Sequence, residues 1–255
     1  METFVVSGGA QHDPRALPAD HLVVTDDAAH LTAAIACWMS DRLASVRGRA
    51  ATIAISGGRT PLALYRLLAS PAWRGSFAWN RLHVFWCDER CVPLAHPENN
   101  AGAAQATWLS RVPIPATHLH PVPELPAAQA AAQYDAQLKA HYGAQHLDAN
   151  RPLFDVVLLG IGADGHTASL FPGDPALSAR TWACAVHRPA PPDRVTLTLP
   201  VLASTAALAF VVTGKDKHEI VQRIAAGDTS LPAAQVQTRG ERAWFLDRDA
   251  AGELA

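Results

Sequence analysis

Short apolar segments alternate with longer segments of helical periodicity along this chain. Apolar runs typical of buried strands lie at residues 51–55, 82–87, 154–159, 206–213 and 244–246, and residues 194–199 alternate apolar with polar side chains. Helical spacing of apolar side chains is found at 26–47, 62–68, from about 100, at 127–142 and at 218–226. Strands that alternate with helices form a largely parallel sheet. We therefore expect an α/β fold: one open, mostly parallel sheet with helices on both faces, in a Rossmann-like three-layer arrangement.

The remaining segments are expected to be peripheral. Residues 1–22 are interpreted as an edge segment followed by a proline-containing loop, and residues 111–126 as a loop with one short strand. No linker divides the chain, and its 255 residues lie close to the size at which a single core stops growing. We predict one domain over residues 1–255.

The charge balance and the cysteines exclude several classes of protein. A formal net charge of -2 offers no basic excess for nucleic acid, and no apolar run is long enough to span a bilayer. The first residues lack the basic and apolar regions of a secretory signal. The four cysteines do not resemble a disulfide framework, which favours reduced thiols and a cytoplasmic location. We expect no nucleic-acid or membrane partner, and a monomer or small homo-oligomer.

Four of the predicted strands end in small or charged residues. These endings are Ser56-Gly57-Gly58, Asp88-Glu89-Arg90, the run from Gly160 to His166, and Gly214-Lys215. Ligands of open parallel sheets bind beyond the carboxyl ends of the strands. The coincidence predicts one site to which all four loops contribute.

The first of these loops, Ser56 to Pro61, lies between a strand and a helix. Glycine allows the backbone to approach a ligand closely, and a helix N-terminus offers unpaired N–H groups to an anion. The segment is therefore a candidate phosphate site. The alternative is a tight turn that binds nothing.

The third loop matches the dinucleotide pattern G-x-G-x-x-G at residues 160–165. That pattern requires a helix packed on the third glycine and an acidic residue about twenty positions further on. Here Pro172 and Gly173 interrupt any helix, and residues 180–186 contain no Asp or Glu. A nicotinamide-dependent dehydrogenase is therefore disfavoured.

Asp164 and His166 flank Gly165 in the same loop. A carboxylate beside an imidazole orients the ring and stabilises its protonated form, and histidine titrates near neutrality, as a general base must. Taken alone, the pair is better explained by a structural role, in which His166 caps a helix and Asp164 satisfies a turn.

Cationic side chains also accompany the strand ends. Arg90, Arg194, Lys215 and Lys217 are candidates for holding a phosphate dianion. The alternative for any one of them is a solvated surface charge.

Two further chemistries receive little support. Cys87 and Cys91 with His83 and His96 suggest zinc, but no second cysteine pair follows. Ser169 lies near His166, but the chain contains no G-x-S-x-G elbow for a nucleophilic serine. We expect neither a metal nor an organic cofactor in the reaction.

Together the motifs resemble the 6-phosphogluconolactonase family. The resemblance rests on Ser56–Pro61, Trp86–Pro93, Asn99-Asn100, Gly160–Pro172, Arg194–Thr198 and Gly214–Lys217, in that order, and covers the chain from about Asp20 to Ala243. The segment Gly165–Pro172 is its most specific part. Many members have Ser where this chain has Arg59, whose role is therefore open.

The resemblance implies hydrolysis of 6-phospho-D-glucono-1,5-lactone, the second step of the oxidative pentose phosphate pathway. His166 would act as general base, and Asp164 would support it. The residues implied in binding the sugar phosphate are Ser56, Gly57, Gly58, Arg59, Asp88, Arg90, Asn100, Gly162, Arg194 and Lys215.

Two other functions stay open at this point. Amino-sugar phosphate deaminases share the Asp-Gly-His turn but follow it with Asn-Glu-Pro, where this chain has Leu170-Phe171-Pro172 and so lacks the extra carboxylate. A non-catalytic sugar-phosphate sensor would need neither Asp164 nor His166, and sensors of this kind usually carry a DNA-binding module, of which the sequence has no sign.

Overall fold

The computed structural model describes residues 5–7, 17 and 21–254. In this part of the chain, eight strands form the main sheet in the order β1-β2-β11-β10-β7-β3-β4-β6. Their bounds are β1 Val5–Ser7, β2 His21–Thr25, β3 Ala51–Ile55, β4 Leu82–Trp86, β6 Leu119–His120, β7 Phe154–Leu159, β10 Thr205–Val212 and β11 Glu241–Asp247. β1 is antiparallel to β2, and the other neighbours are parallel. The predicted α/β fold with an open, mostly parallel sheet is confirmed.

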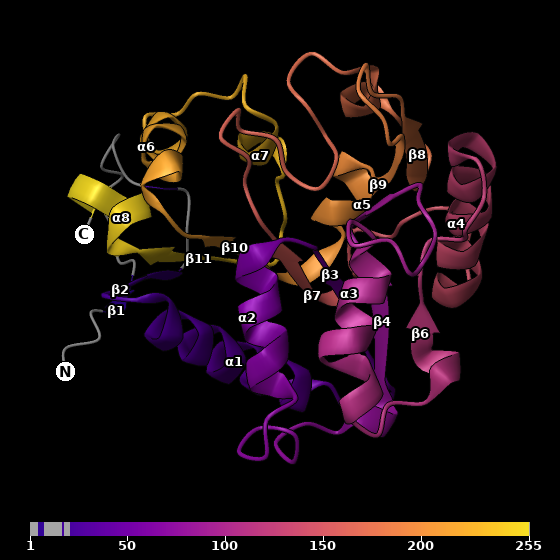
Figure 1. Cartoon of the computed structure of the whole chain (residues 1–255), viewed down its shortest axis with the longest axis horizontal. Coiled ribbons are helices and arrows are strands. Elements are labelled where there is room, and N and C mark those ends of the chain that lie inside the picture. The colour runs from indigo at the N-terminus through magenta and orange to yellow at the C-terminus, as the bar shows by residue number, and fades with distance from the viewer. Residues whose placement is uncertain (1–4, 8–16, 18–20, 255) are drawn as a thin grey trace.

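Helices cover both faces of the sheet (Figure 1). On one face lie α1 (Ala28–Ser45), α2 (Arg59–Leu68) and α3 (Asn100–Thr107), which share one hydrophobic core. On the other lie α4 (Ala127–Tyr142), α6 (His218–Ala225) and α8 (Arg248–Ala251), which share a second core. The helices predicted from apolar spacing are confirmed, whereas α8 and the short helices α5 (Leu199–Ala203) and α7 (Pro232–Gln235) were not predicted.

The two cores are separated by side-chain alternation in the central strands. In β10, Ala207, Ala209 and Val211 face the core under α1 to α3, whereas Leu208, Phe210 and Val212 face the core under α4, α6 and α8. A strand that is buried on both faces has an apolar residue at nearly every position, which is why these strands appear in the sequence as continuous apolar runs.

A smaller antiparallel sheet adjoins the main one, with the order β5-β9-β8. It comprises β5 (Asp88–Arg90), β8 (Ala183–Val186) and β9 (Arg194–Leu197). It pairs Asp88 with Thr196 and Arg90 with Arg194, so two predicted site segments become neighbours.

This small sheet corrects two predictions. Residues 88–90 form a strand of their own, where the sequence predicted only the loop after β4. The strand predicted at 194–199 ends at Leu197, because α5 begins at Leu199 and Pro200 occupies its first turn.

The N-terminal prediction is tested only in part. Residues 1–4, 8–16 and 18–20 lie outside the described residues. Residues 21 and 22 were expected to be loop. They belong to β2, which pairs with β11 so that Leu22 opposes Trp244. The short strand expected within 111–126 is β6. A single domain over 1–255 stays a prediction.

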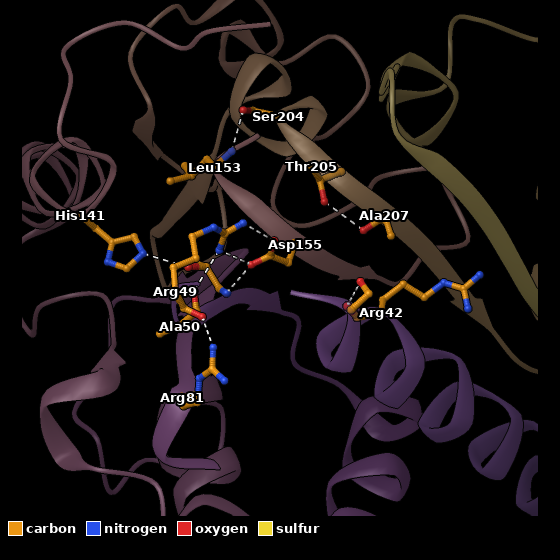
Figure 2. Close-up of polar contacts among 12 residues, drawn as sticks. Arg42, Arg49, Ala50, Arg81, His141, Leu153, Asp155, Ser204, Thr205 and Ala207 are labelled. Atoms are coloured by element: carbon orange, nitrogen blue, oxygen red, sulfur yellow. Dashed lines mark hydrogen bonds and ion pairs between the residues drawn. The ribbon is translucent and has the colours of Figure 1, made fainter. Parts of the chain in front are cut away.

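A charged network closes the sheet at the amino-terminal ends of β3 and β7 (Figure 2). Asp155 accepts two hydrogen bonds from Arg49, at 2.8 and 2.5 Å, and one from the backbone N–H of Thr52, at 2.8 Å. Arg81 donates to the carbonyl of Arg49 at 2.7 Å. The charged side chains at this end of the sheet are therefore paired with one another and with the backbone. The loops predicted to form the site lie at the opposite, carboxyl ends of the strands.

None of the described helices is long and apolar enough to cross a membrane.

Candidate active site

A cavity of about 630 Å³ opens at the carboxyl ends of β3, β7 and β10. All four predicted strand-end loops contribute to its wall, together with residues of other segments. The predicted site residues in its wall are Ser56, Gly57, Gly58, Arg59, Asp88, Arg90, Asn100, Gly162, His166 and Arg194. Asp164 lies immediately behind His166, whereas Lys215 is exposed and does not line the cavity.

The turn after β7 is held by its own backbone. Gly162 N–H donates to the carbonyl of His166 at 2.8 Å, and Gly165 N–H donates to the carbonyl of Gly162 at 3.0 Å. Gly165 has φ of 82°, a left-handed conformation that favours glycine. The chain continues into a bridge between Thr167 and Leu170 rather than into a helix. The helix that a dinucleotide fingerprint requires is therefore missing from this described segment.

The His166 ring is oriented by Asp164. Nδ1 lies 2.5 Å from Oδ1 of Asp164, and the backbone N–H of His166 donates to the same oxygen at 3.1 Å. Partial burial raises the pKa of Asp164, but the hydrogen bonds from the ring and backbone of His166 outweigh it and leave this pKa below its ordinary value. The carboxylate is an acceptor, so Nδ1 carries the hydrogen and Nε2 keeps the lone pair of the neutral ring.

Gly162 lies directly against this pair. A Cβ at position 162 would come within 2.0 Å of Nδ1 of His166 and 2.7 Å of Oδ1 of Asp164. Both distances are far below a normal contact distance. The ring also packs against Phe171, with the two ring centroids 4.6 Å apart. The imidazole therefore occupies the space that a side chain at 162 would take.

Asp88 belongs to a buried polar network in the cavity wall. Its Oδ2 accepts from Oγ of Ser169 at 2.6 Å, and that Oγ accepts from Nη1 of Arg194 at 3.5 Å. Ser169 is fully buried and is not part of the wall. The Ser169 hydroxyl therefore positions Asp88 and does not face the cavity. This arrangement gives no support to Ser169 as a nucleophile.

Asn100 connects the first two loops of the site. Its Nδ2 donates to the carbonyl of Asp88 at 2.9 Å, and its Oδ1 accepts from Nη1 of Arg90 at 2.9 Å. A Cβ at Gly57 would lie 1.8 Å from this Oδ1. Glycine at 57 therefore lets the Ser56-Gly57-Gly58 turn pack directly on Asn100.

The same turn starts helix α2. The hydroxyl of Ser56 is buried and donates to the carbonyl of Leu158 at 2.9 Å, so it fixes the turn to β7. Gly58 is the N-cap of α2, with φ of 109°, and no side chain caps the helix. The N-terminus of α2 thus faces the cavity without a side-chain partner, as an anion site requires.

Cationic side chains gather in the wall. Arg59, Arg90, Arg194 and Lys217 line the cavity. Burial, followed by repulsion from Arg90, lowers the pKa of Arg194. The Nε atoms of Arg90 and Arg194 are buried and find no hydrogen-bond partner among the described residues. Buried donors without acceptors are rare in folded proteins, so the wall is suited to an anionic ligand.

Glu89 is a residue that the sequence analysis did not single out. It is buried, and its carboxylate accepts from the backbone N–H groups of Arg90, Asn100 and Ala101 at 2.7 to 2.8 Å. It therefore holds β5 against the N-terminus of α3. Burial raises the pKa of Glu89 to about 7, against the effect of these hydrogen bonds. The sequence signal for this role is an acidic residue that precedes a predicted helix start. The signal is weak, because eleven positions separate Glu89 from Asn100.

The raised pKa of Glu89 predicts how its contribution to stability varies with pH. Between pH 4.5 and about 7 the folded protein keeps a proton that the unfolded chain loses, so this contribution is full below 4.5 and is lost as pH rises through 7. Glutamine does not titrate. The difference in free energy of unfolding between the wild type and Glu89→Gln should therefore fall by on the order of 2 kcal/mol from pH 5 to pH 8. Urea unfolding at several pH values measures it, and a difference that grows with pH contradicts the assignment.

The zinc site considered from the sequence does not form around the cysteines. Cys87 is buried, and burial raises the pKa of its thiol, which disfavours the thiolate that zinc requires. In the described part of the chain, His83 groups with other histidines and not with Cys87, Cys91 or His96.

With this geometry established, comparison with known proteins decides the family. Residues 26–244 match the model of the family described as glucosamine-6-phosphate isomerases/6-phosphogluconolactonase. The chain belongs to this family.

Individual relatives within the glucosamine-6-phosphate isomerase/6-phosphogluconolactonase family agree. A protein of Nostoc sp. named 6-phosphogluconolactonase is 39% identical over 209 residues, covering 80% of this chain and 85% of the relative. A rat protein of the same name is 40% identical over 254 residues, covering 94% and 96%. The crystal structure of a protein named devB has a TM-score of 0.81 at 34% identity and covers 92% of this chain and 99% of its own. The resemblance stated from the motifs is confirmed.

Proposed function

We propose that this chain is an enzyme that hydrolyses 6-phospho-D-glucono-1,5-lactone to 6-phosphogluconate, in the oxidative pentose phosphate pathway. The observation that carries the proposal is the Asp164-oriented ring of His166 in the wall of a cavity that is also lined by Arg90 and Arg194, whose Nε atoms lack a hydrogen-bond partner among the described residues. Its family relatives named 6-phosphogluconolactonase support it. Hydrolysis of this lactone needs a base, an oxyanion partner and a phosphate site, and these residues supply all three.

The base is Nε2 of His166. It takes a proton from water as the water oxygen bonds to the lactone carbonyl carbon, and a tetrahedral oxyanion forms. The protonated ring then returns the proton to the ring oxygen as the carbon–oxygen bond breaks. Asp164 keeps Nδ1 protonated and stabilises the imidazolium in between. No step requires a metal or an organic cofactor.

The oxyanion and the phosphate need positive groups. Gly162 and Gly165 already use their N–H groups within the turn, so the guanidinium of Arg194, held by Ser169 beside Asp88, supplies charge for the oxyanion. The phosphate is assigned to the N-terminus of α2 at Gly57 and Gly58, with the cations that line the cavity around it.

Lys217 is assigned to the phosphate in place of Lys215. Lys217 lines the cavity, and Lys215 is exposed on the same 3-10 turn. Lys217→Ala should raise KM about tenfold with little change in kcat, because a phosphate contact exists in the ground and transition states alike. Lys215→Ala is the matched control and should change KM less than about twofold. If steady-state assays show the larger rise in KM for Lys215→Ala, the phosphate contact belongs to Lys215.

The rival within the family is an amino-sugar phosphate deaminase. The segment after the turn supplies no carboxylate, because Leu170 and Phe171 are apolar and buried. The test compares two substrates at equal enzyme concentration: the lactone should be consumed, and glucosamine 6-phosphate should release no ammonia. Ammonia release without lactone hydrolysis would overturn the proposal in favour of the deaminase.

A cytoplasmic location and a monomeric or small homo-oligomeric state are proposed on the sequence arguments alone. The substrate is a small sugar phosphate, and we propose no nucleic-acid or membrane partner.

A further inference from the structure

A cluster of histidines lies outside the active-site cavity, at the β6 edge of the main sheet. His83 comes from β4, His120 from β6 and His141 from α4, and each is half-buried. One ring nitrogen of each lies within 4.8 Å of those of the other two. None of the three lines the cavity. His83 is near the start of β4, whereas the active site lies beyond the end of that strand.

The rings contact one another directly. Nδ1 of His83 and Nε2 of His120 are 2.9 Å apart. A fourth ring, His118, stacks on His83 with the centroids 4.1 Å apart, and its Nδ1 is buried without a hydrogen-bond partner among the described residues. Four imidazoles from three segments of the chain thus converge, and one of their nitrogens lacks the partner that a buried polar atom normally has.

The surroundings of His83, His120 and His141 favour the neutral form of each ring. Burial, reinforced by the neighbouring rings, lowers the pKa of His83 and of His120 to about 4. Burial and then the charge of Arg49 lower the pKa of His141, although Asp155, the partner of Arg49, offsets part of this effect (Figure 2). Neutral imidazole is the ligand form of histidine, so a metal need not compete with protons near neutral pH.

Outer partners that orient a ligand ring are also present. Oγ1 of Thr52 lies 2.9 Å from Nε2 of His141 and can accept its N–H. The amide of Gln137 lies beside His120, with its donor Nε2 3.4 Å from Nδ1, and must turn to present Oε1 to the N–H of a metal-bound ring. Oε1 of Gln137 is itself buried without a partner among the described residues. Hydrogen bonds from such groups fix the ring orientation of metal-bound histidines.

We propose that His83, His120 and His141 form a binding site for a divalent transition metal of the zinc class, with a water molecule in the fourth position. An all-imidazole set suits zinc, cobalt, nickel or copper, and does not suit magnesium or calcium, which take oxygen ligands. Two nitrogens on one tetrahedral zinc lie about 3.4 Å apart. The ring nitrogens lie within 4.8 Å of one another, so the more distant ones must close, whereas Nδ1 of His83 and Nε2 of His120, at 2.9 Å, must separate slightly. The metal would join the two-residue strand β6 to β4 and α4, and its role would be to stabilise this edge rather than to take part in the reaction.

The test is metal binding by the whole chain after treatment with a chelator. Titration with Zn²⁺ in a calorimeter should give one site per chain with a Kd tighter than about 10 µM, and the Tm should rise as Zn²⁺ is added. Co²⁺ should give the intense visible absorption of a four-coordinate site. The variant with both His83→Gln and His120→Gln should lose all three signals. His187→Gln is the control, since His187 is exposed and lies outside the cluster, and it should retain them.

Equal Zn²⁺ uptake by the wild type and the double variant would overturn the proposal, and so would uptake that His187→Gln abolishes. Circular dichroism and catalytic activity check that the double variant is folded. If it does not fold, the single variants His141→Gln and His120→Gln replace it, each expected to weaken the Kd at least about tenfold. An unchanged Kd in both would contradict the site.

Discussion

Replacing His166 with alanine is expected to lower kcat for lactone hydrolysis by a factor of about 10² to 10⁴, the range for the loss of a general base. The reason is the geometry of the ring, whose Nδ1 is engaged by Asp164 at 2.5 Å while Nε2 keeps its lone pair at the cavity. KM should change little, because the phosphate contacts come from other loops. Stopped-flow kinetics with the spontaneous hydrolysis subtracted measures the effect, which corresponds to about 3 to 5 kcal/mol in the barrier.

The chain offers a matched control for this variant. His187 also pairs with a carboxylate, with Nδ1 2.8 Å from Oδ2 of Asp193, but it is exposed and does not line the cavity. His187→Ala should keep kcat within about twofold of the wild type, as surface substitutions usually do. If His166→Ala has the same kcat as His187→Ala, His166 does not act as the general base.

Gly162→Ala is expected to reduce kcat nearly as much, by about 10² or more. The added methyl group would lie 2.0 Å from Nδ1 of His166, so the ring must leave the orientation that Asp164 gives it. Phe171 packs against the ring, so the displaced ring has less room on that side. The expected result is therefore a folded protein with a misplaced base.

Gly160→Ala separates this effect from a general effect of alanine in the turn. A Cβ at 160 would meet one atom within 4 Å, the carbonyl oxygen of Val211, at an ordinary contact distance of 4.0 Å. This variant should keep kcat within about twofold of the wild type. Thermal unfolding checks both variants, and equal kcat losses in the two would show that the contact with His166 is not the cause.

The central part of the fold could be predicted because its periodicity is strong and local. Residues 127–142 and 154–159 have the bounds of α4 and β7 that the apolar spacing indicated. The left-handed conformation of Gly143 accounts for the end of α4. The parallel sheet then followed from the alternation of strands and helices.

The small sheet could not be predicted, because distant pairing and not local pattern creates it. β5 consists of Asp88, Glu89 and Arg90, whose side chains give no strand signal, and its partner β9 is about a hundred positions away. β2 is similarly short and pairs with β11, which is remote in sequence. β8 is also short, although its partner β9 follows it closely in the chain. Strands of this kind are defined by their neighbours more than by their own composition.

The cavity could be anticipated because loops at the carboxyl ends of parallel strands lie at one edge of the sheet, and all but two of the predicted site residues line it. Their roles stay predictions. Asp164 contacts the cavity wall only through its hydrogen bond to His166, and Lys215 is exposed and does not line the cavity, whereas Lys217 does. Which lysine of a single 3-10 turn faces the ligand depends on the rotation of that turn, and the sequence carries no record of it. The buried roles of Glu89 and Ser169 likewise depend on contacts between distant segments.

The most direct test of this account is the hydrolysis of 6-phospho-D-glucono-1,5-lactone by the purified wild-type chain, followed by proton release at constant pH. The account predicts a rate that rises in proportion to enzyme concentration and far exceeds the spontaneous rate, and that falls to near the spontaneous rate in His166→Ala. Decay at the spontaneous rate at every concentration of the folded wild-type enzyme would contradict it.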